Sequence, residues 1–370
     1  MGNRRGNGEG SIYKRADGRW AAALTLEGGK RRTIYGKTRQ QVAKGLTAAL
    51  RDREAGLPVT PERQTVEKFL AHWLEVVKPT IRRSTFVRYE EYIRLHTIPV
   101  IGGIRLPRLT PQHLQDLYAQ KLSEGLSPTS VRHLHTVLHR ALKQALRWDL
   151  VVKNVSEAVD PPRRARPEYQ ALAPEQVRQF LRAAHEDRLE ALYVLAVTTG
   201  MRRGEILGLH WRDVSFDQGV LQVRYTLQQG GVLGEPKTAK GRRQIDLPLL
   251  SVEALQRHRI QQLKDRMEAG ASWVDSNFVF TNAVGKYIDP DNLRHRSFGP
   301  LLHRAGLPQI RFHDLRHTAA TLLLSLDTRP KIVQELLGHS QIGVTMDVYS
   351  HILPTMQREA MNNLDKLLRA

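Results

Sequence analysis

The last third of the chain carries residue types that suit chemistry on a phosphate. Between residues 311 and 351, four candidates stand among apolar residues at helical spacing: His313, Arg316, His339 and Tyr349. Guanidinium and imidazole groups bind phosphate oxygens through charged hydrogen bonds, and a phenol oxygen can act as a nucleophile. The stretch therefore predicts an active site at which Tyr349 attacks a phosphorus atom.

Short helices must position these side chains. The run TAATLLLSL predicts a helix that is buried on most sides. His313 and Arg316 share one face at its beginning, where free N–H groups can also bind an anion. KIVQELLG predicts a second helix that ends at its glycine and delivers His339 into the next turn. Ser340 can cap a third helix, which carries Tyr349.

A further candidate lies upstream, where RLEALYVLAVTTGMRRGEILGLHWRDV predicts an apolar helix that ends at Gly200. A second helix then begins with Arg202 in its first turn, so its guanidinium and the backbone N–H groups can bind the same anion. Glu205 lies one turn further along and is placed to orient Arg202. The alternative is a surface ion pair, which contributes less than about 1 kcal/mol.

Three segments after these helices, GVLQVRYTLQQ, GVLGEPKTAKG and RRQIDLPL, predict the strands of one small antiparallel sheet. Lys237 lies in the turn region before the last strand. A lysine at a hairpin tip can donate a proton to a leaving oxygen as a general acid. Lys240 competes for this role, and most hairpin lysines simply face water.

Composition limits the classes of function. The chain has 370 residues, enough for two or three domains, and its net charge of +20 (sequence pI near 10.4) favours a polyanionic partner over a merely soluble basic surface. It has no cysteine, which excludes disulfides, thiolate catalysis and cysteine zinc sites. The sequence contains no apolar run of membrane-spanning length and MGNRRGNGEG is no signal peptide core, so we expect a cytoplasmic protein without a membrane partner.

Residues 1–60 predict a small basic domain, with a net charge of +8. GSIYKR, RWAAALTL and KRRTIYG predict three short strands, followed by an amphipathic helix that Thr38 caps and Gly56 ends. Such a sheet can lie in a DNA groove, and the alternative is a solvated basic hairpin. The candidate DNA contacts are Arg15, Arg19, Arg31 and Arg32.

Residues 64–158 predict an all-helical domain of four helices, TVEKFLAHWLEVV, STFVRYEEYIRLHTIPVIG, TPQHLQDLYAQKLSEG and SPTSVRHLHTVLHRALKQALRW. The predicted helix starts are Thr65, Ser84, Thr110 and Ser127. The last helix offers polar residues that can line a DNA backbone: Arg132, Arg140 and Lys143, with His133, His135 and His139. His135 and His139 have the spacing of a zinc pair, but no third ligand is nearby, so a polar helix face is favoured over a metal site.

DPPRRARPEY predicts an extended basic connector to a third domain, residues 168–370, which begins with the helix ALAPEQVRQFLRAA and ends in the tail ILPTMQREAMNNLDKLLRA. The fold class expected for the whole chain is multidomain and mainly α with small antiparallel sheets. It comprises a three-stranded sheet plus helix, a helical domain and an α+β catalytic domain.

The series TTGMRRGE, PKT, HDLRHT, LGHS and the Tyr349 helix closely resembles the catalytic motifs of tyrosine recombinases. GSIYKR, DGRW and GKTR resemble the amino-terminal arm-binding domains of phage and conjugative-element integrases, and the helical segment resembles the family's core-binding domain. The resemblance covers essentially the whole chain and implies double-stranded DNA as the partner, bound at core sites and at arm sites.

The resemblance also implies a role for each residue. Tyr349 attacks the scissile phosphodiester and becomes joined to the 3′ phosphate, which frees a 5′ hydroxyl. Arg202 and Arg316 hold the non-bridging oxygens, and His313 helps to take the tyrosine proton. The remaining roles are proton donation to the 5′ oxygen, for which the PKT motif favours Lys237, and a further phosphate hydrogen bond from His339. We expect no metal, cofactor or ATP requirement, and four protomers on two DNA sites, with the tail passed to a neighbouring subunit.

Four functions fit these expectations to different degrees. The leading hypothesis is an integrase that inserts and excises a mobile element, assisted by a directionality factor or a DNA-bending protein. A cellular Xer-like recombinase that resolves chromosome dimers is the alternative within the same chemistry. A type IB topoisomerase-like enzyme shares the nucleophile but needs no arm sites, and a DNA-binding regulator would carry an inert site.

Overall fold

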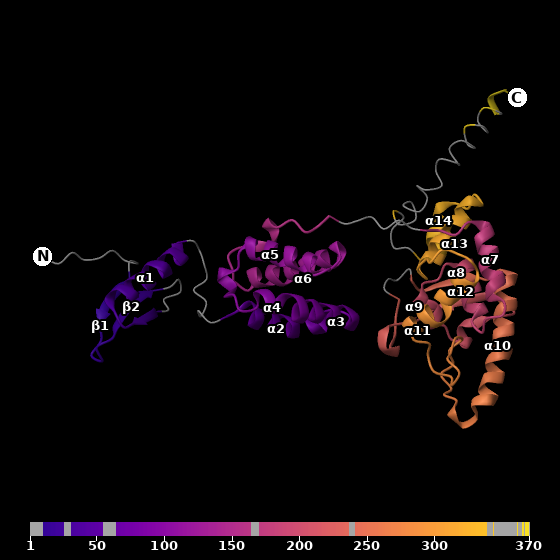
Figure 1. Ribbon diagram of the computed structural model, residues 1–370, viewed down its shortest axis with the longest axis horizontal. Helices are drawn as coiled ribbons and strands as arrows, with labels where there is room; N and C mark the ends of the chain where they lie inside the picture. The colour runs from indigo at the N-terminus through magenta and orange to yellow at the C-terminus, as the bar shows by residue number, and fades with distance from the viewer. Residues whose placement is uncertain are drawn as a thin grey trace. The chain divides into compact units, whose positions relative to one another are not determined.

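The structure is a computed structural model that describes residues 10–25, 31–54, 64–163, 170–236 and 241–338, with single positions beyond them at 343, 361, 365 and 367–369. The chain divides into two compact units, Met1–Arg166 and Pro167–Ala370. Each unit is described by itself (Figure 1). Within the described residues, none of the helices has the length and apolar character needed to cross a bilayer. The three-domain division, with its boundaries near residues 60–64 and 158–168, stays a prediction.

The first unit begins with an antiparallel sheet of three strands in the order β1-β2-β3, which confirms the predicted strands. The bounds are β1 Ser11–Lys14, β2 Trp20–Thr25 and β3 Arg31–Gly36, followed by helix α1 Arg39–Glu54. Ala22 and Leu24 of β2 pack against Val42 and Leu46 of α1. Thr38 Oγ1 accepts a hydrogen bond from the backbone N–H of Gln41 at 3.2 Å, as expected of a helix cap. The predicted helix end at Gly56 lies outside the described residues.

Helices make up the rest of the first unit. They are α2 Val66–Val77, α3 Arg83–Glu91, α4 Ile98–Ile101, α5 Pro111–Ser123 and α6 Pro128–Arg147. The second predicted helix is not a single regular one, because a π-helical stretch, Tyr92–Thr97, joins α3 to α4. Pro99 lacks the N–H that a regular helix would use there, which accounts for the wider turn.

Side-chain hydrogen bonds cap three of the four predicted helix starts. Thr65, Thr110 and Ser127 each accept a backbone N–H from the third residue beyond, so these three caps are confirmed. The predicted helix start at Ser84 is wrong, because α3 begins at Arg83 with Arg82 in the N-cap position. Ser84 lies inside the first turn and so cannot cap the helix, because an N-cap residue has a non-helical backbone conformation.

The second unit is an α+β domain around one buried helix. Its helices are α7 Pro174–Ala184, α8 Glu190–Thr199, α9 Arg203–Leu207, α10 Leu249–Ala269, α11 Pro290–Asn292, α12 Gly299–Arg304, α13 Asp314–Ser325 and α14 Pro330–Leu337. Helix α8 is apolar on nearly all sides and packs against α7, α10 and α13 (Figure 1). A π-helical stretch, Leu293–Phe298, again precedes a proline, Pro300.

The predicted single sheet of this domain is two sheets. β4 Val214–Ser215, β5 Val220–Val223 and β8 Arg243–Asp246 form one, and β6 Thr226–Leu227 pairs with β7 Leu233–Gly234 in the other. GVLQVRYTLQQ is therefore split between β5 and β6. Residues Thr226 and Leu227 instead lie against α9, where an added Cβ at Gly204 would stand 2.6 Å from Thr226 Oγ1. This packing accounts for the break.

Candidate active site

The end of α8 brings two distant segments together. Gly200 ends the helix in the left-handed conformation, with φ of 61°, where a glycine is favoured. A Cβ added at Gly200 would lie 2.3 Å from Cδ2 of Leu337. The glycine of the TTGMRRGE motif therefore allows both the chain reversal before Arg202 and the close approach of α14.

Arg202 stands at the N-cap of α9, as the sequence predicted for the start of a helix. Its Nη1 donates to Glu205 Oε1 at 2.7 Å, and its backbone N–H donates to Oε2 of the same carboxylate at 3.0 Å. Side-chain exposure is 37% for Arg202 and 2% for Glu205. The alternative of a surface ion pair does not hold, because the carboxylate is buried while the guanidinium faces outward.

Arg243, which is not among the residues predicted from the sequence, completes this network. Its Nη2 donates to Glu205 Oε2 at 3.0 Å, and its side chain is 8% exposed. The strand pattern contained a signal, because Arg243 and the buried Ile245 lie two positions apart on β8 and so share one face of the strand. An arginine on the inward face of a strand requires an acceptor, and Glu205 is that acceptor.

Arg316 lies on the buried side of α13 and is 3% exposed. Its Nη1 donates to the carbonyl of Gly200 at 2.7 Å and its Nη2 to the carbonyl of Leu337 at 2.6 Å. Burial, together with the nearby Arg202 and Arg243, lowers the pKa of Arg316 to about 9, and the Glu205 carboxylate opposes that shift. The predicted pairing of His313 and Arg316 at the beginning of one helix is correct.

Three consecutive carbonyls at the end of α14 accept hydrogen bonds from three different arginines. Leu336 accepts from Nε of Arg243 at 2.6 Å, Leu337 from Arg316, and Gly338 from Nη2 of Arg202 at 3.1 Å. The last carbonyls of a helix have no partner within the helix, so these donors satisfy them. The arginines thereby fix the chain immediately before His339.

The charges of this cluster do not balance. Arg202, Arg243 and Arg316 bring three guanidinium groups to the one buried carboxylate of Glu205. Burial alone would raise the pKa of the Glu205 carboxyl, but Arg243 and Arg202 hold it below its usual range. Glu205 is therefore an anion, and the described side chains retain a surplus of positive charge suited to a phosphate.

His313 occupies the N-cap position of α13, and its ring lies 5.2 Å from that of His317 in an edge-to-face arrangement. Although its outer edge is exposed, the surrounding protein desolvates the ring. This desolvation, with the neighbouring His317, Arg316 and Arg202, lowers the pKa of His313 to about 4, against a raising effect of Asp314. At neutral pH the imidazole is uncharged, the form that can accept a proton.

The remaining predicted catalytic residues, Lys237, Lys240, His339 and Tyr349, lie outside the described residues. Pro236 and Gly241, on either side of residues 237–240, and Gly338, directly before His339, are described. A Cβ added at Gly241 would lie 2.5 Å from Cβ of Pro236, so the two ends around residues 237–240 lie against each other. The three roles assigned to these side chains, nucleophile, general acid and phosphate hydrogen-bond donor, stay predictions.

Two of the four candidate DNA contacts of the small sheet, Arg15 and Arg19, are exposed. Arg15 stacks over the Tyr35 ring at 5.1 Å, and Arg19 donates to the Asp17 carboxylate. Positions 31 and 32 pair with Thr25 and Leu24 and are consecutive in β3, so they belong to opposite faces of the sheet. Their side chains lie outside the described residues.

On α6, the polar residues divide into two groups. Arg132, Arg140 and Lys143 are exposed, and Arg140 donates to the Tyr89 hydroxyl at 3.2 Å. His135 and His139 differ from the exposed polar face that the sequence suggested. His135 Nδ1 lies 3.1 Å from the Tyr118 hydroxyl, and His139 Nδ1 lies 3.1 Å from Ser156 Oγ. These contacts tie both rings to neighbouring elements, and a role in DNA binding stays a prediction.

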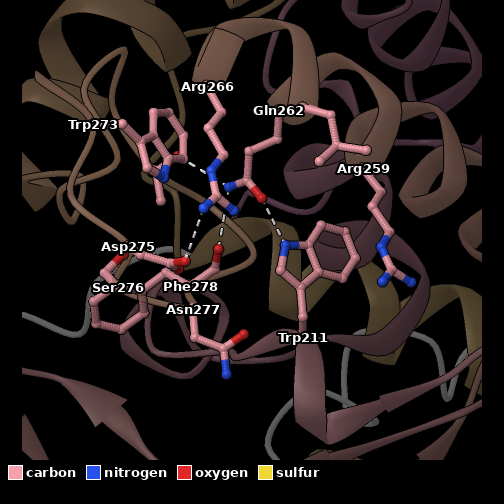
Figure 2. Close-up of a pocket in the computed structure, with 11 residues that line it drawn as sticks. Trp211, Arg259, Gln262, Arg266, Trp273, Asp275, Ser276, Asn277 and Phe278 are labelled. Atoms are coloured by element: carbon pink, nitrogen blue, oxygen red, sulfur yellow. Dashed lines mark hydrogen bonds and ion pairs between the residues drawn. The ribbon is translucent and has the colours of Figure 1, made fainter. Parts of the chain in front are cut away.

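A hollow of about 250 Å³ lies between α10 and residues 273–281 (Figure 2). Its polar groups pair mainly with one another. Trp211 Nε1 donates to Gln262 Oε1 at 2.6 Å, and Arg266 forms an ion pair with Asp275 at 3.4 Å. Arg259 lies over the Trp211 ring at 5.6 Å. These contacts explain the hollow as part of the packing of α10 against the following loop.

Known proteins are similar to this chain over most of its length. The model of the phage integrase family matches residues 170–356, and that of the phage integrase N-terminal SAM-like domain matches residues 65–123. A tyrosine recombinase XerC-like protein of Caldanaerobacter subterraneus is 30% identical over 366 residues, covering 92% of this chain and 93% of that protein. An integrase of Streptomyces ambofaciens is 32% identical over 385 residues, covering 98% and 97%.

The fold is shared with a solved integrase. The Tn1549 transposon integrase, in complex with transposon right-end DNA, superposes with a TM-score of 0.69 at 24% identity, covering 82% of this chain and 100% of that one. The likeness in fold, the family models and the relatives over nearly the full length agree with one another. The chain belongs to the phage integrase family of tyrosine recombinases.

Proposed function

We propose that this recombinase is the integrase of a mobile element, which cleaves and rejoins DNA strands through a 3′-phosphotyrosine intermediate. The observation that carries the proposal is the cluster of Arg202, Arg243 and Arg316 around the single carboxylate of Glu205. The surplus positive charge of this cluster can stabilise a phosphodiester, which gains negative charge in its transition state.

The steps follow from the residue types. The Tyr349 oxygen bonds to phosphorus, and the bond from phosphorus to the 5′ oxygen breaks. His313, uncharged at neutral pH, accepts the phenol proton, and Lys237 gives its proton to the departing 5′ oxygen. Arg202 offers a phosphate the N–H groups that Glu205 and Gly338 do not use. Arg316 is 3% exposed, so its contact with the phosphate requires the residues over it to move when DNA binds.

The proposed DNA partner fits the basic surface of the first unit. The exposed face of the small sheet has Tyr13 and Tyr35 on either side of the small residue Ala21, with which both are paired in register. Ala21 is buried, so the exposed Tyr13 and Tyr35 and the basic residues beside them form the face that would meet a DNA groove. Residues 1–60 would thereby bind an arm site, and Arg132, Arg140 and Lys143 of α6 a core site.

Four protomers follow from the reaction, because exchange between two duplexes cuts four strands and each active site cuts one. The proposal includes such a homotetramer on DNA, a directionality factor or DNA-bending protein as helper, and the cytoplasm as the place of action. The second candidate is a cellular Xer-like recombinase, which the 30% identical XerC-like relative favours. An arm-binding domain argues for the integrase, since chromosome dimer resolution needs no second class of DNA site.

A covalent trapping experiment tests the proposal. The target sequence is first selected from a random duplex pool by binding to the full-length Tyr349→Phe protein. A nick is then placed beside the cleavage point, so that the short strand carrying the 5′ hydroxyl diffuses away. Wild-type protein should form a protein–DNA adduct in EDTA, and Tyr349→Phe should not. Strand exchange between two labelled duplexes then separates a recombinase from a topoisomerase, and protection at a distant second site separates an integrase from an Xer-like enzyme.

A further inference from the structure

Each guanidinium nitrogen of Arg243 donates to a different segment of the catalytic unit. Nε donates to the carbonyl of Leu336 at 2.6 Å, Nη1 to the carbonyl of Gly241 at 3.2 Å, and Nη2 to Glu205 Oε2 at 3.0 Å. In the described part of the chain, Arg202 and Arg316 use two side-chain nitrogens each. Arg243 is therefore the arginine of this cluster whose three side-chain nitrogens all donate to described protein atoms.

Each of the three segments leads to a proposed catalytic group. Glu205 holds the guanidinium of Arg202. Gly241 directly follows residues 237–240, which include Lys237 and its competitor Lys240, and it lies against Pro236 before them. Leu336 precedes His339 by three residues. One buried side chain thus connects Glu205, Gly241 and Leu336. These three residues respectively hold, follow and precede the proposed phosphate-binding arginine, general acid and second histidine.

We propose that Arg243 is a positioning residue for DNA cleavage, which fixes Glu205, the base of the 237–240 segment and the end of α14 relative to one another. The inference rests on the proposed function, since it concerns the same active site. Arg243 does not touch the DNA in this account. Its buried guanidinium acts through Arg202, Lys237 and His339.

The physical consequence of removing Arg243 is a loss of alignment. Glu205 would keep Arg202 as its remaining cation, and the carbonyls of Leu336 and Gly241 would lose a donor. A displacement of about 1 Å in a catalytic group can lower a rate by on the order of 10²-fold. The affinity for DNA should change little, because that affinity comes from exposed cations.

The variants are Arg243→Gln, Arg243→Lys and, as a matched control, Arg242→Gln. Arg242 is the neighbouring residue, and its exposed side chain pairs with Glu235. For each full-length protein the melting temperature, the Kd for the selected duplex and the single-turnover rate of adduct formation at saturating DNA are measured. Lysine keeps the charge beside Glu205 but has one nitrogen, so it cannot replace a fork that joins three segments.

The expected result is a folded Arg243→Gln protein whose Kd stays within about threefold and whose adduct rate falls by on the order of 10²-fold. Arg243→Lys should recover only part of that rate, and Arg242→Gln should match the wild type. The proposal is overturned if a folded Arg243→Gln forms the adduct at the wild-type rate at saturating DNA.

If Arg243→Gln does not fold, Arg243→Lys decides the question. A folded Arg243→Lys with the wild-type rate overturns the proposal, and a folded one with at least a roughly tenfold slower rate at unchanged Kd supports it. Wild-type protein that forms no adduct with the selected duplex would instead contradict the proposed function, and the positioning role would fall with it.

Discussion

The buried guanidinium of Arg316 donates to the carbonyl of Gly200 at 2.7 Å, across 116 positions of the chain. The same side chain holds the carbonyl of Leu337, so α13 connects the end of α8 to the end of α14. Arg202 lies two positions after Gly200, and His339 lies two positions after Leu337. The geometry of the phosphate site thus depends on the helix ends.

Gly200→Ala should destabilise the catalytic unit through two separate effects. A left-handed conformation costs an alanine about 1 kcal/mol, and the new Cβ would overlap Leu337, which adds roughly 1–3 kcal/mol. The control is Gly219→Ala, where φ is 62° but none of the described atoms lies within 4 Å of an added Cβ. Urea denaturation should show the larger loss at Gly200. Equal losses would mean that the approach of Leu337 is not tight.

Glu205→Gln should leave Arg202 and Arg243 without their shared anion and lower the free energy of unfolding by about 3 kcal/mol at pH 7. The folded-state pKa of Glu205 is lowered, so its stabilising effect is present above the unfolded pKa and is lost as the pH falls through the folded pKa. The difference from wild type should therefore shrink at acid pH. Glu235→Gln, at an exposed ion pair, is the control and should differ little from wild type at any pH.

His313 should titrate well below an ordinary histidine in the free protein. Desolvation and the neighbouring cations lower its pKa to about 4, so the ring should be neutral throughout the range from pH 5 to 8. A bound phosphate brings negative charge and should raise that pKa. Nuclear magnetic resonance of the labelled imidazole can follow both states, with His313→Gln to assign the signal. A pKa near 6.5 in the free protein would contradict the desolvated environment.

Arg15→Gln should weaken binding to the arm site and lower the salt dependence of that binding by about one ion. Arg15 is exposed beside Tyr35 on the face of the sheet that is proposed to meet DNA. The control Arg178→Gln removes an exposed arginine from α7 of the other unit, where it pairs with Glu175. Footprints at increasing salt concentration should separate the two variants. An unchanged arm footprint in Arg15→Gln would argue for a solvated hairpin.

Helix ends were predictable where a local rule decides them. Gly200 and Gly338 adopt the left-handed conformation at the ends of α8 and α14, and Thr110 caps α5. Glycine and threonine at these positions act through their own backbone and side chain, with no need of distant partners. The positions of Arg202 and His313 at helix starts followed from the same local rules.

Features that depend on distant contacts were not predictable. The split of the sheet after Val223 follows from the packing of Thr226 against α9, which no strand pattern records. The role of Arg243 depends on Glu205, 38 positions away, and on Leu336, 93 positions away. The alternating pattern of β8 could indicate that Arg243 faces inward, but not which carboxylate it would meet.

The most direct test of the account is the identity of the residue that becomes joined to DNA. The trapped adduct is digested with nuclease and trypsin, and the nucleotide-bearing peptide is sequenced by mass spectrometry. The account predicts a nucleotide 3′-phosphate on Tyr349, within the tryptic peptide 332–358. A nucleotide on any other residue, or an adduct that persists in Tyr349→Phe, would contradict it.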